Sequence, residues 1–217
     1  MDMLLKDKTA LVTGASVGIG AAIAKALAAE GVRVAISARR VDKLNDTAAA
    51  IKAAGGPAPV ILESDLYQPD AATSLAERAV KALGGVDILI NNAGGSRPFK
   101  DLHVSEAQWE EAMTLNFHRP RQLADALVDQ MIERKWGRII NITGKSEPEH
   151  VNGAFCAKAA VHSWAKGLSR MVGQHGITVN CIPPGRIHSE QIYRNYSRSE
   201  EHTSELQSRQ YLVCRLL

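Results

Sequence analysis

Three glycines near the N-terminus have the spacing Gly-x-x-x-Gly-x-Gly, which differs from the commoner dinucleotide-binding fingerprint. Gly14, Gly18 and Gly20 stand between an apolar run of strand length, Lys8–Thr13, and a stretch with alanine and leucine at helical spacing. Glycine lets the backbone turn tightly and approach a ligand, and a helix N-terminus favours negative charge. The segment therefore predicts pyrophosphate binding, and the alternative is a tight turn without a ligand.

The elements that must position this turn follow one another in strict alternation. Apolar runs predict strands over residues 8–13, 32–37, 59–63, 87–91, 138–143 and 178–182. Helical patterns predict helices over 19–30, 41–54, 71–83, 105–133 and about 157–172, the fourth opened by a capping box at Ser105. Alternation of this kind predicts an α/β fold with one doubly wound, Rossmann-type parallel sheet in the order 3-2-1-4-5-6.

Composition excludes several classes of protein. The chain has 217 residues, 45% of them hydrophobic, and a net charge of +3 without a basic block, which does not favour nucleic acid. No apolar run is long enough to span a membrane, and the N-terminus has no signal-peptide pattern. Cys156, Cys181 and Cys214 are not spaced as a disulfide or metal framework. We therefore expect a cytoplasmic protein.

The last twenty residues do not continue the pattern. Residues 198–208 read RSEEHTSELQS, which resembles the translation of a sequencing adapter. We therefore expect one domain over residues 1–197, C-terminally truncated, and a non-native tail over 198–217. The alternative is a polar native tail.

Four further segments accompany the glycine-rich turn in a fixed order. They are Asp65-Leu66, Asn91-Asn92-Ala93-Gly94, Asn116, and Asn180-Cys181-Ile182-Pro183-Pro184-Gly185 with Ser189 after it. Together the motifs resemble the short-chain dehydrogenase/reductase family from Leu5 to Ser189. The resemblance implies a nicotinamide dinucleotide. It also implies these cofactor contacts: Gly14, Ser16, Gly18, Ile19, Gly20, Arg39, Asp65, Leu66 (at adenine), Asn92, Ala93, Gly94, Lys158, Pro184, Gly185 and Ile187.

The choice of cofactor is expected to depend on the end of the second strand. NAD-preferring enzymes usually place a carboxylate there for the ribose hydroxyl, and this chain has Ala38 at that position. A guanidinium can hold a 2′-phosphate through charge-assisted bonds, and by resemblance Arg39 would do so, assisted by Ser16 or Ser37. We predict a preference for NADP(H) over NAD(H). The alternative is that Arg39 and Arg40 only lie exposed before the second helix.

The reaction site departs from the family. The resemblance assigns Lys158 to the Lys that binds the nicotinamide ribose, and Asn116 to the Asn that supports a proton relay. The family's proton-donating Tyr stands four residues before that Lys, and here the position is Ala154. The family's Ser position is Gly144, and the loop that follows is shorter than usual. Two of the four catalytic groups are therefore missing.

Substitutes for these groups stand close by in sequence. The candidates are Thr143, Lys145, Ser146, Glu147, Glu149 and His150. Ser146 is the foremost candidate for polarising a carbonyl, and His or Glu could deliver a proton. The alternative is that all of them are solvated loop residues.

Two functions follow from these residues. The first is an NADP(H)-dependent oxidoreductase that acts on a ketone or secondary alcohol through an atypical proton donor. The second is a catalytically inactive NADP(H)-binding protein, a sensor or partner subunit. The expected partners are a small carbonyl or alcohol substrate and, by resemblance, further copies of the chain in a homodimer or tetramer, with no nucleic acid, membrane or metal.

Overall fold

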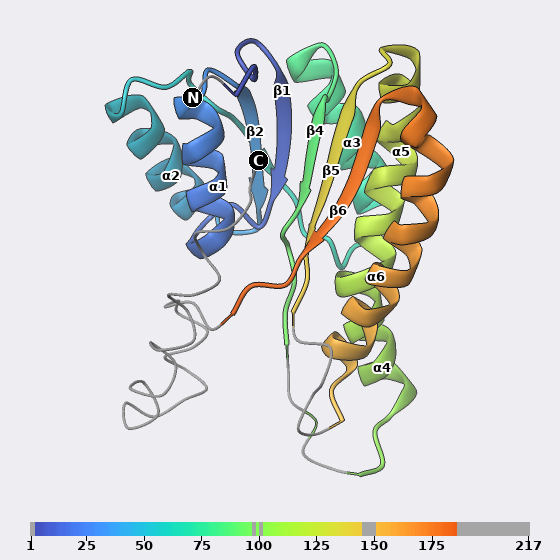
Figure 1. Ribbon diagram of the computed structural model, residues 1–217. Helices are drawn as coiled ribbons and strands as arrows, with labels where there is room; N and C mark the ends of the chain where they lie inside the picture. Colours follow the sequence, from blue (N-terminus) through green and yellow to red (C-terminus); the bar gives the residue numbers. More distant parts are fainter. Residues whose placement is uncertain (1–2, 97–98, 100–101, 145–150, 186–217) are drawn as a thin grey trace.

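Six parallel strands make one sheet in the order β3-β2-β1-β4-β5-β6, which confirms the predicted order. The computed structural model describes residues 3–96, 99, 102–144 and 151–185. The strands are β1 (Thr9–Thr13), β2 (Arg33–Ala38), β3 (Val60–Glu63), β4 (Ile88–Asn91), β5 (Gly137–Ile142) and β6 (Ile177–Ile182). Their carboxyl ends lie together at the lower edge of the sheet in Figure 1, where the chain turns from β1 into α1.

Helices cover both faces of the sheet, as a doubly wound fold requires. In Figure 1, α1 (Gly18–Ala29) and α2 (Val41–Ala53) lie on one face, and α3 (Ala71–Leu83), α5 (Arg119–Glu133) and α6 (Gly153–Val172) lie on the other. Alternate residues of a strand point to opposite faces. Leu11 of β1 therefore packs in the core under α3 and α5, while Val12 packs in the core under α1 and α2.

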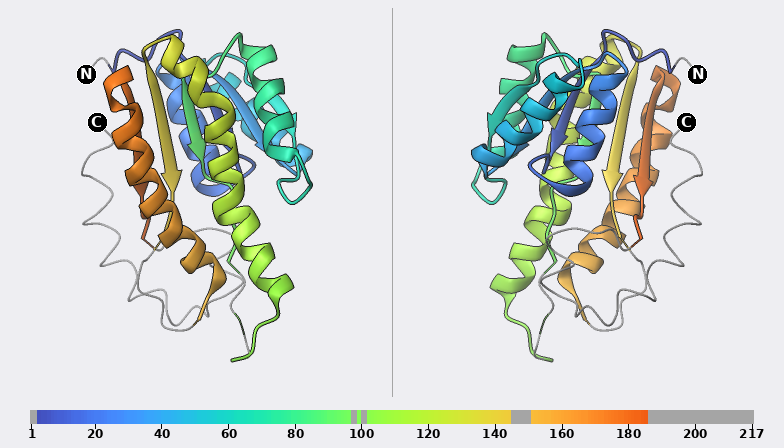
Figure 2. Two further views of the ribbon diagram at one scale, coloured as in Figure 1. Left: turned by 90° about the vertical axis from the view of Figure 1, so that its right-hand side faces the viewer. Right: turned by 90° about the vertical axis from the view of Figure 1, so that its left-hand side faces the viewer.

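The predicted long helix over residues 105–133 is divided, which corrects that prediction. It consists of α4 (Glu106–Met113), a π-helical segment (Thr114–His118) and α5. Pro120 has no N–H, so it cannot donate to the carbonyl four residues before it. The N–H of Arg119 donates to the carbonyl of Thr114, five residues before it, which is the bond of a π-helix. Figure 2 shows α4 continuing the line of α5 beyond the sheet. Asn116 thus lies in the π-helical segment rather than in an α-helix.

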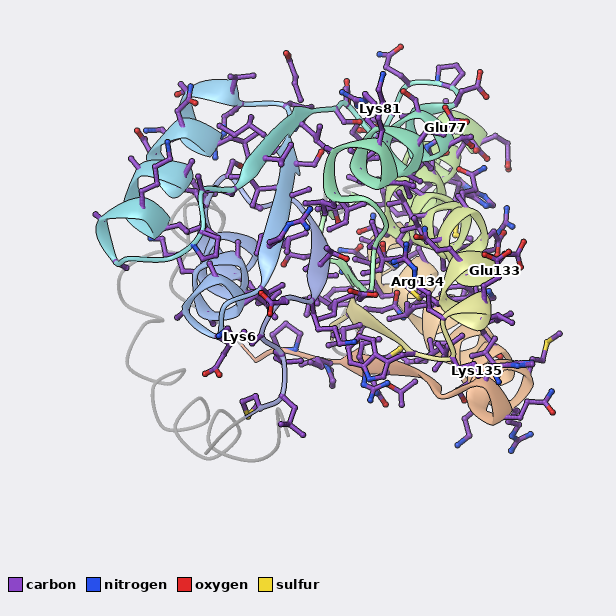
Figure 3. All side chains as sticks on the ribbon, turned by 90° about the horizontal axis from the view of Figure 1, so that it is seen from above. Lys6, Glu77, Lys81, Glu133, Arg134 and Lys135 are labelled. Carbon is purple, nitrogen blue, oxygen red and sulfur yellow. The ribbon has the colours of Figure 1, made fainter. Side chains whose placement is uncertain are left out.

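Exposed charged side chains lie at the edge of the sheet where the strands begin. Figure 3 looks onto this edge, where Lys6, Glu77, Lys81, Glu133, Arg134 and Lys135 are exposed. Arg134 binds the carboxylate of Asp87 at 3.4 Å and the carbonyl of Gly84 at 2.8 Å. In the described part of the chain, no group of His, Cys, Asp and Glu could hold a metal ion, and no helix is long and apolar enough to cross a membrane.

Some predictions fall outside the described residues. These are the domain end at residue 197, the tail over 198–217, and the candidate residues Lys145, Ser146, Glu147, Glu149, His150 and Ile187.

Candidate functional site

The turn between β1 and α1 can be built only with glycine at two of its positions. Gly14 has φ +65°, and a Cβ there would lie 2.9 Å from the Cα of Ala93. A Cβ at Gly20 would overlap the carbonyl oxygen of Gly14 and the side-chain nitrogen of Asn92. The first turn of α1 therefore packs directly against the turn and the loop after β4.

Gly18 has a different environment from the other two glycines. Its φ is +60°, but a Cβ built there meets nothing within 4 Å among the described residues. The cap of α1 is Val17, whose side chain cannot accept from the first N–H groups of the helix, and the first turn contains no acidic residue. Among the described residues no side chain occupies these N–H groups, and with the helix dipole they can bind an anion, so the turn fits a pyrophosphate.

Asn92 and Thr13 fasten this turn to the loop after β4. The Asn92 side chain donates to the carbonyls of Thr13 and Gly14, at 3.0 Å each. The Thr13 hydroxyl accepts from the backbone N–H of Asn92 at 3.1 Å and of Ala93 at 3.0 Å. The ends of β1 and β4 are thus held in one arrangement, on which a dinucleotide could lie.

Asn116 holds the next part of the same loop. Its side-chain nitrogen donates to the carbonyl of Gly95 at 3.0 Å and to that of Ala112 at 2.9 Å, and its oxygen accepts from the N–H of Gly95 at 3.2 Å. Asn116 is buried, with 3% of its surface exposed. The geometry therefore shows Asn116 as a support for the loop.

Asn152 is a site residue that the sequence analysis missed. Its oxygen caps α6 by accepting from the N–H of Ala154 at 2.9 Å, and its nitrogen donates to the Ser96 hydroxyl at 2.9 Å. An Asn one residue before a helix is a recognisable N-cap signal. The bond to Ser96, across 56 positions of sequence, has no such signal.

Lys158 reaches the same region from α6. Its Nζ donates to the carbonyl of Ile142 at 2.8 Å, and a Cβ at Gly94 would lie 3.3 Å from that Nζ. Burial lowers the pKa of Lys158 to about 8, because the ammonium loses hydration and no charge compensates for the loss. Lys158 thus lies between the ends of β4 and β5 as an amine that changes its charge near neutral pH.

The two positions that the resemblance aligned with the family's Tyr and Ser, Ala154 and Gly144, lie beside Lys158. Ala154 is one helical turn before it on the same face of α6, as expected, and is 4% exposed. A Cβ at Gly144 would contact the Lys158 side chain and the Phe155 ring, both at 3.7 Å. Thr143 is buried at 4% exposure with its hydroxyl unpaired among the described residues, so it is badly placed to meet a substrate.

The ends of β2 and β3 lie farther along the same edge. Arg39 is exposed just after β2, and within the part of the chain that the structure describes no residue pairs with its guanidinium. Ser16, between Gly14 and Gly18, is half-buried, whereas Ser37 in β2 is 2% exposed. Asp65 and Leu66 follow β3, which pairs with β2.

The other predicted contacts lie at the ends of the remaining elements. Ile19 is half-buried in the first turn of α1, and Pro184 and Gly185 follow β6, half-buried and exposed respectively. The structure therefore brings residues from the ends of all six strands to one edge of the sheet.

Comparisons with known proteins agree with this arrangement. The family model described as short chain dehydrogenase matches residues 8–200. Nodulation protein G of Rhizobium sp. (strain N33) is 37% identical over 190 residues, which cover 85% of this chain and 75% of that protein.

Two solved structures are similar to this chain in both fold and sequence. One, described as a short-chain alcohol dehydrogenase of Sinorhizobium meliloti 1021, has a TM-score of 0.84 and 31% identity, covering 93% of this chain and 81% of that one. The other is a metagenomic short-chain oxidoreductase in complex with NADP, with a TM-score of 0.78 and 34% identity, covering 84% of both chains. The chain belongs to the short-chain dehydrogenase/reductase family, whose members are oxidoreductases acting on CH–OH and C=O groups.

Proposed function

We propose that this chain is an oxidoreductase that binds NADP(H) in preference to NAD(H) and acts on a ketone or secondary alcohol. The observation that carries the proposal is the arrangement at the carboxyl edge of the sheet. A helix start without a side-chain cap, an exposed arginine with no partner among the described residues, and a desolvated lysine lie along the ends of neighbouring strands. Ligands of open α/β sheets bind at this edge, where the strand order reverses between β1 and β4.

Each part of the dinucleotide has a matching group in the chain. The N–H groups at the start of α1 would hold the pyrophosphate, and Arg39 with Ser16 would hold the 2′-phosphate. Asp65 and Leu66 would lie at the adenine, and Pro184, Gly185 and Ile187 would complete the nicotinamide end. A bound nicotinamide supplies or accepts the hydride of the reaction. The nucleotide bound to a relative of 34% identity supports this assignment.

The proton for the substrate oxygen must come from an atypical donor. Lys158 would hold the nicotinamide ribose, and Asn116 would keep the loop beside it in place. Neither Ala154 nor Gly144 has a hydroxyl, so Ser146 is the first residue to test as a replacement and His150 the second. General acid catalysis contributes roughly 10²–10⁴-fold, so turnover of common carbonyl substrates should be lower by about that factor.

A second function is favoured by the same substitutions. The loss of both hydroxyls at Gly144 and Ala154, with the nucleotide-binding turn intact, fits a protein that binds NADP(H) without consuming it. Such a protein would act as a sensor or as a partner subunit. In either case the family commonly assembles into oligomers, and we propose a homodimer or tetramer.

The decisive experiment follows NADPH absorbance with a panel of ketones and aldehydes while calorimetry measures NADPH binding. We expect binding together with slow, substrate-dependent oxidation, which Ser146→Ala reduces further. Adding both hydroxyls, with Ala154→Tyr and Gly144→Ser in one chain, should raise turnover, and each single variant is the control. Tight binding without oxidation in any variant would favour the sensor, and absence of binding would refute both functions.

A further inference from the structure

Arg119 makes an unusually complete set of contacts for a half-buried arginine. Its Nε donates to the carbonyl of Leu66 at 2.7 Å, and its Nη2 donates to the carbonyl of Gln68 at 2.8 Å. Its Nη1 donates to the side-chain oxygen of Gln122 at 2.7 Å, one turn along α5. Two of the three bonds therefore fix the backbone of the loop between β3 and α3, across more than 50 positions of sequence.

The loop also contacts the sheet directly, because the N–H of Ser64 donates to the carbonyl of Ala38 at 3.1 Å and the Leu66 side chain is buried in the core. Within the loop, the Asp65 carboxylate accepts from the N–H of Tyr67 at 3.2 Å, and the Asp65 carbonyl accepts from the N–H of Gln68 at 3.0 Å. Both bonds are local and shape the turn without placing it on the sheet. Charge-assisted bonds from a planar guanidinium to two carbonyls fix both position and direction. Arg119 thus adds two directed bonds that hold the backbone of Leu66 and Gln68, the part of the loop that follows Asp65.

The place of this loop along the sheet edge decides what it faces. The pyrophosphate-binding turn follows β1, Arg39 follows β2, and the loop follows β3, which pairs with β2 through Ala38 and Glu63. A dinucleotide whose pyrophosphate lies at α1 and whose 2′-phosphate lies at Arg39 has its adenine next in this direction. We propose that Arg119 is a positioning residue for the adenine half of the nucleotide site, an inference that rests on the proposed function.

The π-helical segment (Thr114–His118) lies directly before Arg119 and affects the direction of its side chain relative to Asn116. Asn116 in the π-helical segment holds Gly95, and Arg119, directly after that segment, holds Leu66. A regular α-helix would place these two side chains, three residues apart, on nearly the same face. The wider π turn changes their relative direction, and π-helical segments frequently occur at functional sites. One short segment thereby supports the loops at both ends of the proposed nucleotide.

The test measures each half of the nucleotide separately on the full chain. Calorimetry gives the affinity for adenosine 2′,5′-bisphosphate, the adenine half, and for nicotinamide mononucleotide, the other half. Arg119→Ala should weaken adenosine 2′,5′-bisphosphate by about tenfold, the scale of one lost charge-assisted bond, and leave the mononucleotide unchanged. Arg119→Lys should fall between, because an ammonium cannot serve both carbonyls. Arg121→Ala is the matched control, since Arg121 binds Asp125 on the same helix.

Hydrogen exchange of residues 63–70 provides a second measurement without ligand. It should become faster in Arg119→Ala and remain as in the wild type in Arg121→Ala. Unchanged affinity for adenosine 2′,5′-bisphosphate in a folded Arg119→Ala variant would overturn this inference alone. Equal weakening of both fragments would also overturn it, because the role would then be general stability. A wild-type chain that binds neither fragment would contradict the proposed function and this inference together.

Discussion

At the scale of single residues, the preference for a nucleotide depends on the charge at the end of β2. Ala38 offers no carboxylate to a ribose hydroxyl, and Arg39 lies exposed with its guanidinium unpaired among the described residues. A guanidinium gains two charge-assisted bonds with a 2′-phosphate and gains much less from a hydroxyl. A prediction of cofactor preference can be made from sequence at this position, because it depends only on which residue types follow the strand.

We expect Arg39→Asp to reverse the preference for NADPH over NADH. One lost charge-assisted pair corresponds to about ten- to hundredfold in affinity, and the new carboxylate would repel the 2′-phosphate while accepting from the NADH ribose. Calorimetric titration of both nucleotides into wild type, Arg39→Asp and the neighbouring Arg40→Asp measures the effect. Equal affinity of the wild type for both nucleotides would refute the role of Arg39.

Lys158 should give the free protein a characteristic dependence of stability on pH. Its pKa in the folded chain is lowered to about 8 from 10.5, so between these values the unfolded chain binds more protons. The free energy of unfolding therefore rises with pH in that window through this group, and the unfavourable burial of the charge is fully present below pH 8. The pKa depends on tertiary burial, so no sequence motif could have predicted it.

Lys158→Met should remove the rise of the free energy of unfolding between pH 8 and pH 10.5 that this group causes. The measurement is the urea midpoint between pH 7 and pH 10, without nucleotide, for wild type, Lys158→Met and Lys166→Met. Lys166 is an exposed lysine of the same helix and should leave the slope unchanged. An identical slope in wild type and Lys158→Met would show that Lys158 does not lose its proton in this range.

At the scale of elements, hydrophobic periodicity predicted the order of strands and helices, but not the start of α6 at Gly153 or the side-chain contacts between elements. A period of 3.6 residues continues through Thr114–His118 closely enough that the π-helical segment leaves no separate pattern. The contacts of Asn152 and Arg119 join elements distant in sequence, and such pairs have no local signature. The residues that the sequence analysis did not name, Asn152 and Arg119, therefore hold loops in place.

Asn152→Ala tests one of these supports. Loss of an N-cap costs about 0.5–2 kcal/mol, and the variant also frees Ser96 in the loop after Gly94. We expect lower stability in urea together with weaker NADPH binding. Ser105→Ala is the matched control, because Ser105 caps α4 with a capping box at an exposed position. That control should lose stability but keep its affinity, and an Asn152→Ala variant with unchanged affinity would limit Asn152 to capping.

At the scale of the whole molecule, the order of strands in the sheet follows from general rules on how strands and helices are connected. Alternating strands and helices with right-handed crossovers leave few arrangements, and the observed order is one of them. The carboxyl edge of such a sheet collects the end of every strand, so residues from position 14 to position 185 meet there. What remained open was the chemistry, because the positions that the resemblance aligned with the family's Ser and Tyr are Gly144 and Ala154, neither of which has a hydroxyl.

A nucleotide that contacts several strand ends should stabilise the whole domain rather than one loop. Binding to the folded state alone adds about 2.7 kcal/mol when the ligand is at one hundred times its Kd. For a domain of this size each kcal/mol raises the Tm by roughly 2–4 °C, so saturating NADPH should raise it by about 5–10 °C. NADH at the same concentration should raise the Tm less, because it lacks the phosphate that Arg39 would bind, and in Arg39→Asp the order should reverse. Differential scanning calorimetry over a series of nucleotide concentrations gives the result, with adenosine as the control that lacks phosphate groups. A Tm that NADPH leaves unchanged at every concentration would show that the edge of the sheet does not bind the dinucleotide, however well its residues match.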